Sequence, residues 1–162
     1  IRPSTVCGYA KRQRLDVVVN IFTNHAVNNG RIRVFGGNQK RPNIHIADMV
    51  RLYLFLLDQP DEKIDGKIYN AGDENHTLLE LSEIVKKVVG QDLEVDVEPT
   101  DDLRSYHVTG KKIRDELGFE LEHNVEDAVR DLAEAFAEGK LPDALEDERY
   151  FNIKLMQNKK HT

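Results

Sequence analysis

Two arginines stand in sequence contexts that suit the binding of a phosphate group. Arg41 follows a glycine-containing turn, and Arg104 lies in the run 101–106, just before a short predicted extended segment. A guanidinium group donates two parallel hydrogen bonds, and this planar fork matches the oxygens of a phosphate. On spacing alone, an arginine is more often a surface or ion-paired residue, so both interpretations stay open.

Other motifs that could carry chemistry are scarce. The patterns H-E-x-x-H, G-x-S-x-G and C-x-x-C do not occur, and the six histidines lie singly along the chain. The run Phe35–Gln39 has two adjacent glycines without the spacing of a dinucleotide-binding loop, so it indicates a strand-ending turn. His45 stands just before a predicted buried helix, where a structural histidine bonded to the backbone is the favoured interpretation.

Composition bounds the class of protein. A length of 162 residues with 40% hydrophobic and 32% charged residues is typical of one globular domain. The net charge of −6 argues against a nucleic-acid partner, although a few placed arginines can still bind an anionic ligand. The single cysteine, Cys7, excludes an internal disulfide and suits a reducing cytoplasm, where we expect the protein. No apolar run reaches membrane-spanning length, so no membrane partner is expected.

The elements that must position these residues follow from periodicity and end signals. Apolar spacing predicts a helix over Leu15–Asn28, with Gly30 where a C-cap glycine belongs. The segment Ala47–Asp58 is apolar nearly all round and predicts a buried helix. Thr77 opens a capping box that starts another helix. The remaining predicted elements are strands within 1–6, 32–35, 43–46, 67–71 and 93–97, an extended piece at 105–108, and helices over 109–117 and 124–137.

Strands that alternate with helices predict an α/β or α+β domain. The chain begins inside the strand-like run Ile1–Val6, so we expect that further sequence precedes it. From Leu141 onward the chain is mostly charged, and its apolar residues within 150–156 are expected to dock on a neighbour. We therefore predict a domain over residues 1–140 and a charged tail over residues 141–162.

Five segments, taken in order, carry a resemblance to a known family. The run Ile1–Gly8 looks like the pattern L-R-x-x-x-V-Y-G, and Arg33–Gly37 looks like the strand and turn that follow it. The run Arg41–Asp48 is similar to R-x-x-I-H-V-x-D, the most specific single match, and the last two segments are Tyr69–Gly72 and Asp102–Phe119. In this order they resemble the extended short-chain dehydrogenase/reductase (SDR) family, in particular its NAD-dependent sugar-nucleotide epimerases and dehydratases.

The resemblance implies the carboxyl-terminal part of a Rossmann-type extended SDR: the last strands of the parallel sheet and the smaller mixed α/β substrate domain. It implies NAD or NADP bound mainly by an amino-terminal half, and a homodimer of the full-length protein. The glycine-rich cofactor loop and the catalytic Y-x-x-x-K pair are expected upstream of Ile1, because Lys11 follows Tyr9 too closely to match that pair. In such enzymes the tyrosine removes a hydroxyl proton while hydride passes to the cofactor, so this chain alone is expected to be inactive.

The resemblance also implies roles in binding a nucleotide-sugar substrate. Arg41 is expected to clamp the diphosphate. Arg33 and Phe35 are expected to border the base. Asp102 and Arg104 are expected to meet the ribose or the phosphates.

Further residues are implied to face the reacting end of the substrate. Thr5 is expected to face the sugar, with Asp16 and Asn20 as substrate-facing polar groups on the first helix. Pro3 and Ser4 are expected to lie against the nicotinamide. Two residues, His45 and Asp48, are implied to be mainly structural and to fix the loop that presents Arg41.

The chain departs from the family pattern at two places. Cys7 replaces the usual tyrosine, and the run Glu98–Thr100 stands where several members carry a second phosphate-binding arginine. Three functions therefore stay open: the substrate-binding part of an epimerase, dehydratase or reductase of nucleotide-sugars, an extended SDR acting on a non-nucleotide alcohol or ketone, and a non-catalytic binding or assembly module.

Overall fold

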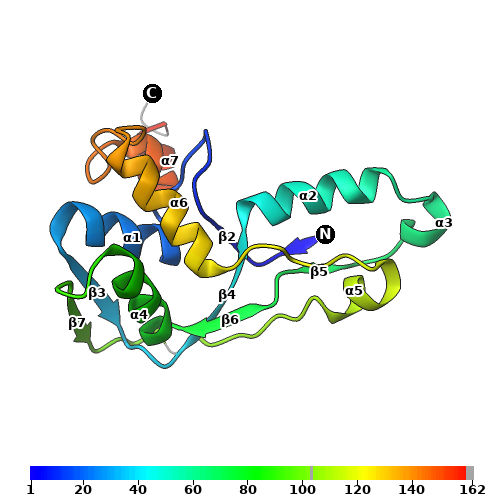
Figure 1. Ribbon diagram of the computed structural model, residues 1–162, viewed down its shortest axis with the longest axis horizontal. Coiled ribbons are helices and arrows are strands. Elements are labelled where there is room, and N and C mark those ends of the chain that lie inside the picture. Colours follow the sequence, from blue (N-terminus) through cyan, green and yellow to red (C-terminus); the bar gives the residue numbers. More distant parts are fainter. Residues whose placement is uncertain (103, 160–162) are drawn as a thin grey trace.

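The computed structural model describes residues 1–102 and 104–159, in which strands alternate with helices. Leu103, within the last matching segment, and residues 160–162 of the predicted tail lie outside the described residues. Two groups of helices lie at opposite ends of the molecule (Figure 1). One holds α1 (Val18–Asn29), α4 (Leu78–Val89) and α6 (Val125–Ala137), and the other holds α2 (Ile46–Leu57), α3 (Asp61–Ile64) and α5 (Lys111–Leu117). The predicted α/β class is confirmed.

The strands form three small sheets among the described residues. Strand β1 (Arg2–Pro3) pairs in parallel with β5 (Asn70–Ala71), and β3 (Arg31–Phe35) pairs in parallel with β7 (Glu94–Glu98). Strand β4 (Lys40–His45) lies parallel to β2 (Thr5–Cys7) and antiparallel to β6 (Glu74–Thr77).

The prediction of one strand within residues 1–6 is wrong, because the chain changes partner at Ser4. The backbone N–H of Ser4 donates to the carbonyl of Ala71, after which Thr5 lies beside Asn43 of β4. The pattern of apolar residues cannot reveal such a change, because both halves are extended. Residues 105–108, predicted as an extended piece, form no strand.

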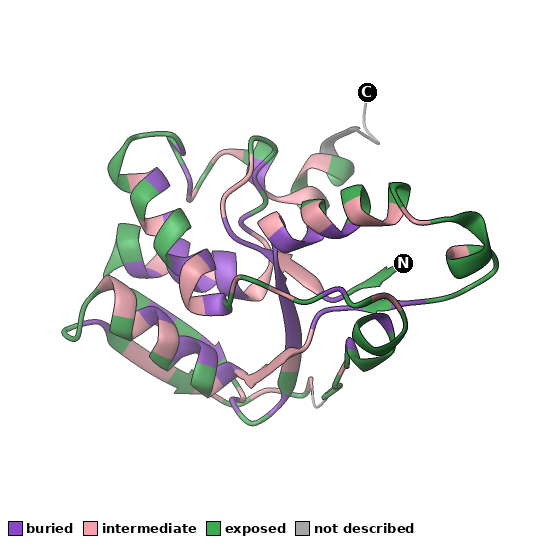
Figure 2. Cartoon of the chain, turned by 45° about the vertical axis from the view of Figure 1, so that its right-hand side comes forward, coloured by how far each residue is buried: buried purple, intermediate pink, exposed green. Residues whose placement is uncertain are grey.

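The largest core cluster lies between α1, α4, α6 and the inner face of β3. Val19, Ile32, Val85 and Val129 are fully buried there, and Figure 2 shows buried residues on the facing sides of these helices. The predicted helix ends are confirmed: Gly30 has a φ of 63°, and Thr77 with Glu80 forms the reciprocal capping box. A second box is formed by Asn124 with Asp127.

Helix α2 departs most from the prediction. Met49 and Leu52 are its buried apolar residues, but the helix is not buried all round. Four large apolar residues spaced as one helical face are between 50% and 81% exposed. This α2 stripe consists of Val50, Tyr53, Leu54 and Leu57. Figure 2 shows exposed residues along the outer side of α2. The expectation of burial is wrong for this chain because no described element covers that face.

The start of the predicted tail packs against the domain. Leu141, Ala144 and Tyr150 join Leu15 and Leu132 in one buried cluster. The chain then passes through a 3₁₀ turn, η1 (Glu148–Tyr150), into α7 (Asn152–Lys159). The boundary at residue 140 stays a prediction.

Asp48 ties the start of α2 to the segment before α6. Its fully buried carboxylate accepts hydrogen bonds from the backbone N–H groups of Glu122 and His123, and Arg51 donates to it. Burial alone would raise the pKa of the Asp48 carboxyl, but these hydrogen bonds outweigh it and hold the pKa below its usual value.

Asp48→Asn is expected to lower the free energy of unfolding by about 2–4 kcal/mol at neutral pH, because a buried charged acceptor is lost. Since the folded pKa is depressed, the carboxylate stabilises the native chain above its unfolded pKa, and this stabilisation is lost as the pH falls through the folded pKa. The difference between the two proteins in urea unfolding should therefore shrink in acid. The exposed Asp58→Asn, at the other end of α2, should change stability by less than about 0.5 kcal/mol. An Asp48→Asn protein as stable as the native chain would contradict this role.

Candidate functional site

Three of the predicted site residues meet at the start of β4. The Arg104 guanidinium binds Asp102 through two parallel hydrogen bonds, Nε to Oδ1 at 2.7 Å and Nη2 to Oδ2 at 2.8 Å. Arg41 Nη2 lies 3.5 Å from the same Oδ2, and Arg41 Nη1 donates to the Arg104 carbonyl. The Arg104 hydrogen bonds hold the pKa of Asp102 well below its usual range, so this carboxylate stays ionised.

Arg41 is held firmly although it lies at the surface. Its side chain is only 16% exposed, whereas that of Arg104 is 82% exposed. The Tyr106 ring lies 5.4 Å from the Arg41 guanidinium carbon, close enough for a cation–π contact. The Nε–H of Arg41 has no hydrogen-bond partner among the described residues. An arginine fixed on one side with a donor left over is suited to an anionic ligand.

The turn before β4 uses its own backbone donors. The N–H of Gly36 donates to the Glu98 carbonyl, and the N–H of Gly37 donates to the Gln39 side chain at 2.6 Å. Gly36 has a φ of +86°, and a side chain there would clash with Gln39 and Thr100. This geometry supports the interpretation as a strand-ending turn, because neither N–H is free for a phosphate.

Arg33 and Phe35 lie together on the outer face of β3, beside α1. They line a cavity of about 650 Å³ with Ile21 and Phe22 of α1. The Phe35 ring is half exposed, and an exposed aromatic face offers a stacking surface. The cavity is also lined by His25, Asn29 and Arg31.

A short path joins this cavity to the arginine cluster. Phe35 precedes Gly36, whose Cα faces the Thr100 side chain. The Thr100 hydroxyl accepts a hydrogen bond from the backbone N–H of Asp102, the partner of Arg41. Phe35 and Arg41 are therefore linked in the fold through Gly36, Thr100 and Asp102.

The other predicted contacts line a second cavity of about 420 Å³ at β2. Pro3, Ser4, Thr5 and Asn20 are among its lining residues. Thr5 pairs with Asn43, and Asn43 shares one face of β4 with Arg41 because it is two residues further along the strand. Thr5 and Arg41 therefore share one face of this sheet.

Asn20 and Asp16 have structural partners. The buried Asn20 side chain accepts a hydrogen bond from the N–H of Gly8 and donates to the carbonyl of Arg14 at 2.8 Å, so it holds the loop after β2. Asp16 pairs with Arg14 and accepts from the N–H of Asn152, and it does not line this cavity. Of the two, only Asn20 lies beside the other predicted contacts.

The fit of this chain to a nicotinamide cofactor is partial. The buried hydroxyl of Ser4 and the buried Oδ1 of Asn43 have no hydrogen-bond partner among the residues that the structure describes. Such unpaired groups are unusual, and Ser4 lines the cavity at β2. Pro3 and Ser4 thus offer a polar contact suited to one edge of a nicotinamide ring. No described residues form a glycine-rich loop that could hold the phosphates of the cofactor.

One pair with the spacing Y-x-x-x-K does occur in the chain, at Tyr150 and Lys154, and sequence analysis missed it. Tyr150 is 9% exposed, and burial, followed by the charge of Asp147, raises its pKa. Lys154 lies over the ring of Phe151. Tyr150 packs in the buried cluster with Leu15 and Leu132, and this supports a structural role for the pair.

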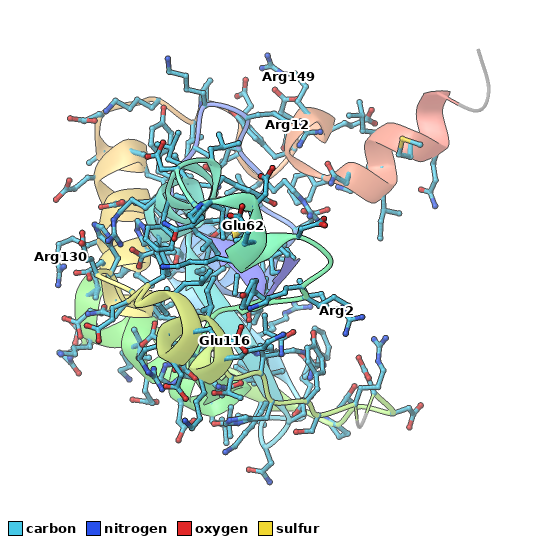
Figure 3. All side chains as sticks on the ribbon, turned by 90° about the vertical axis from the view of Figure 1, so that its right-hand side faces the viewer. Arg2, Arg12, Glu62, Glu116, Arg130 and Arg149 are labelled. Atoms are coloured by element: carbon cyan, nitrogen blue, oxygen red, sulfur yellow. The ribbon has the colours of Figure 1, made fainter. Side chains whose placement is uncertain are left out.

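Sequence analysis also missed residues that line the two cavities. Arg12, Gln13 and Arg14 line the cavity at β2, and Arg12 donates to the side chain of Asn152 at 3.1 Å. Figure 3 shows Arg12 on the same side of the molecule as Arg149. The basic run at residues 11–14 can be recognised in the sequence. Only the fold shows that part of it lines the same cavity as Thr5.

A family model matches the first part of the chain. Residues 1–72 match the NAD dependent epimerase/dehydratase family. This match includes Pro3, Ser4, Thr5 and Arg41 but ends before Asp102. The family resemblance is therefore confirmed for residues 1–72, whereas its extension to the later segments stays a prediction.

Solved structures resemble a larger part of the chain. UDP-glucose 4-epimerase from Thermotoga maritima, solved with UDP-glucose, is 25% identical with a TM-score of 0.71, over 86% of this chain and 45% of that one. UDP-glucuronic acid 4-epimerase from Bacillus cereus is 20% identical with a TM-score of 0.71, over 85% and 44%. L-threonine dehydrogenase from Phytophthora infestans is 14% identical with a TM-score of 0.70, over 85% and 47%. The last two likenesses show the fold alone.

The chain spans about half the length of the solved structures that it matches. Within the described residues, no helix combines the length and apolar character that crossing a bilayer requires.

Proposed function

We propose that this chain is the substrate-binding part of an NAD(P)-dependent epimerase or dehydratase of nucleotide-sugars. The observation that carries the proposal is Arg41, held against Asp102 and Tyr106 with a free Nε–H, a short path from the exposed ring of Phe35. An aromatic surface and a fixed guanidinium at the two ends of one path match the base and the diphosphate of a nucleotide.

The residues divide the work of binding between them. Arg41 would bind the diphosphate, and the ionised Asp102 would accept a hydrogen bond from a ribose hydroxyl. Phe35 would stack on the base. Thr5, on the same sheet face as Arg41, would orient the sugar beside Pro3 and Ser4. The chemistry that a nicotinamide cofactor would supply beside Pro3 and Ser4 is reversible hydride transfer with the sugar. By fixing the two ends of the substrate, this chain would lower the entropic cost of the reaction.

The α2 stripe supports the proposal of a partial enzyme. Parallel strands occur almost always in sheets covered by helices on both faces, and a pair as short as β1–β5 is not stable by itself. The stripe and the free edge of β1 would pack against the cofactor-binding half. That half would supply the catalytic tyrosine and lysine, so this chain alone would be inactive.

A second candidate is an extended SDR that acts on a non-nucleotide alcohol, since the same fold occurs in L-threonine dehydrogenase. Calorimetric competition separates the two candidates. Under the first, UDP-glucose and UDP saturate one shared site, and L-threonine in large excess leaves their binding unchanged. Binding of L-threonine without binding of any nucleoside diphosphate would reverse the assignment.

A further inference from the structure

The cavity beside β3 carries more polar chemistry than stacking needs. Ile21, Phe22 and Phe35 contribute its apolar lining, and His25 and Asn29 of α1 contribute polar lining together with two arginines. His25 is half buried and Asn29 is exposed at the rim. A base stacked on Phe35 in this cavity would present its hydrogen-bonding edge toward one of these polar walls.

The contact between His25 and Asn29 fixes which ring nitrogen carries the proton. Asn29 Nδ2 lies 2.9 Å from His25 Nδ1. An amide nitrogen can only donate, so Nδ1 accepts and the proton of the neutral ring sits on Nε2. Burial, followed by the positive charge of Arg33, lowers the pKa of His25, so the ring is neutral at pH 7. Nε2 has no partner among the described residues, so one N–H donor is left for a ligand.

We propose that His25 selects nucleobases by donating from Nε2 to an exocyclic carbonyl oxygen, with Asn29 positioning that proton. The inference rests on the proposed function, because it assumes a nucleotide in this site. Uracil, thymine and guanine carry a carbonyl oxygen where cytosine and adenine carry an amino group. An amino group facing the Nε2–H would put two donors against each other, and both would lose their partners.

UDP and CDP test this proposal directly, because both are pyrimidine nucleotides that differ at this edge of the ring. The native chain is expected to bind UDP about 10-fold more tightly than CDP, as one well-placed hydrogen bond distinguishes them. In His25→Ala, UDP binding should weaken about 10-fold while CDP binding stays nearly unchanged, so that the preference disappears. Val27→Ala, an exposed change on the same helix that leaves the cavity lining intact, should keep the preference.

Asn29→Asp tests the positioning role of Asn29. A carboxylate accepts rather than donates, so it moves the ring proton to Nδ1 and leaves Nε2 as an acceptor. In mildly alkaline buffer, where the ring is neutral, the ratio of UDP to CDP affinity should fall below one. The ¹⁵N chemical shifts of the His25 ring should report the change of tautomer independently of binding.

The outcomes separate this inference from the proposed function. If UDP and CDP bind equally well and both depend on Arg41, the base selection is wrong while the nucleotide site stands. A UDP preference that survives both His25→Ala and Asn29→Asp would overturn the roles of these two residues. If no nucleoside diphosphate binds at all, the inference and the proposed function fail together.

Discussion

Replacing Arg41 by alanine is expected to weaken UDP binding about 10- to 100-fold, because hydrogen bonds to charged groups contribute about 1.5–3 kcal/mol each. The effect should fall on the diphosphate: binding of uridine, which has no phosphate, should change little. Arg41→Lys keeps the charge but loses the planar fork, so it should lie between the alanine variant and the native chain. Calorimetric titration of each protein measures these constants.

A control for Arg41→Ala is Arg130→Ala on α6. Arg130 also pairs with carboxylates, those of Glu126 and Asp127, but it projects from the outer side of α6 (Figure 3). The Arg130→Ala variant should therefore bind UDP as tightly as the native chain does. Arg104→Ala removes the two hydrogen bonds to Asp102 and so tests whether that pair helps to position Arg41. We expect Arg104→Ala to weaken UDP binding less than Arg41→Ala does. Equal losses for Arg41→Ala and Arg130→Ala, or no loss for either, would contradict a diphosphate site at Arg41.

Joining this chain to a cofactor-binding half is expected to produce the largest change in activity. The chain alone should show no nicotinamide reduction with UDP-glucose, because the proposal places the catalytic tyrosine and lysine in the other half. A protein in which a related cofactor-binding half precedes Ile1 should turn over its nucleotide-sugar. General acid–base catalysis alone contributes about 10²- to 10⁴-fold, and positioning adds to it. Nicotinamide absorbance in single-turnover experiments provides the measurement.

The α2 stripe supplies the matched control for that experiment. Leu54→Asp with Leu57→Asp should prevent docking of the two halves while leaving UDP binding to the isolated chain intact, since the stripe is distant from Arg41 along the fold. Val27→Ser, another exposed apolar position but on α1, should leave activity unchanged. Measurable turnover by the isolated chain, or full activity with two charges in the stripe, would refute the division into halves.

Local signals in the sequence predicted the helices of the larger core well. The capping boxes at Thr77 and Asn124 and the glycine at Gly30 act within one turn of backbone, so their chemistry is readable from neighbouring residues. The periodic apolar faces of α1 and α6 likewise depend only on spacing.

Features set by distant partners could not be predicted in this way. The change of strand partner at Ser4 depends on Ala71, and the exposure of the α2 stripe depends on which element covers the helix. Asn20 has the polarity of a substrate contact, but its hydrogen bonds go to Gly8 and Arg14. Arg41, Asp102 and Arg104 were named through a family resemblance, and only the fold shows their mutual contacts.

The most direct test of the central claim is the intact mass of the native protein, together with the coding sequence upstream of Ile1. We expect a native chain about twice as heavy as the 18.6 kDa of residues 1–162, because the solved structures that it resembles are about twice as long. The added segment should contain a glycine-rich strand–helix start and a Y-x-x-x-K pair. A native protein of 18.6 kDa that binds no separate cofactor-binding chain would contradict the proposal that this is one half of an enzyme.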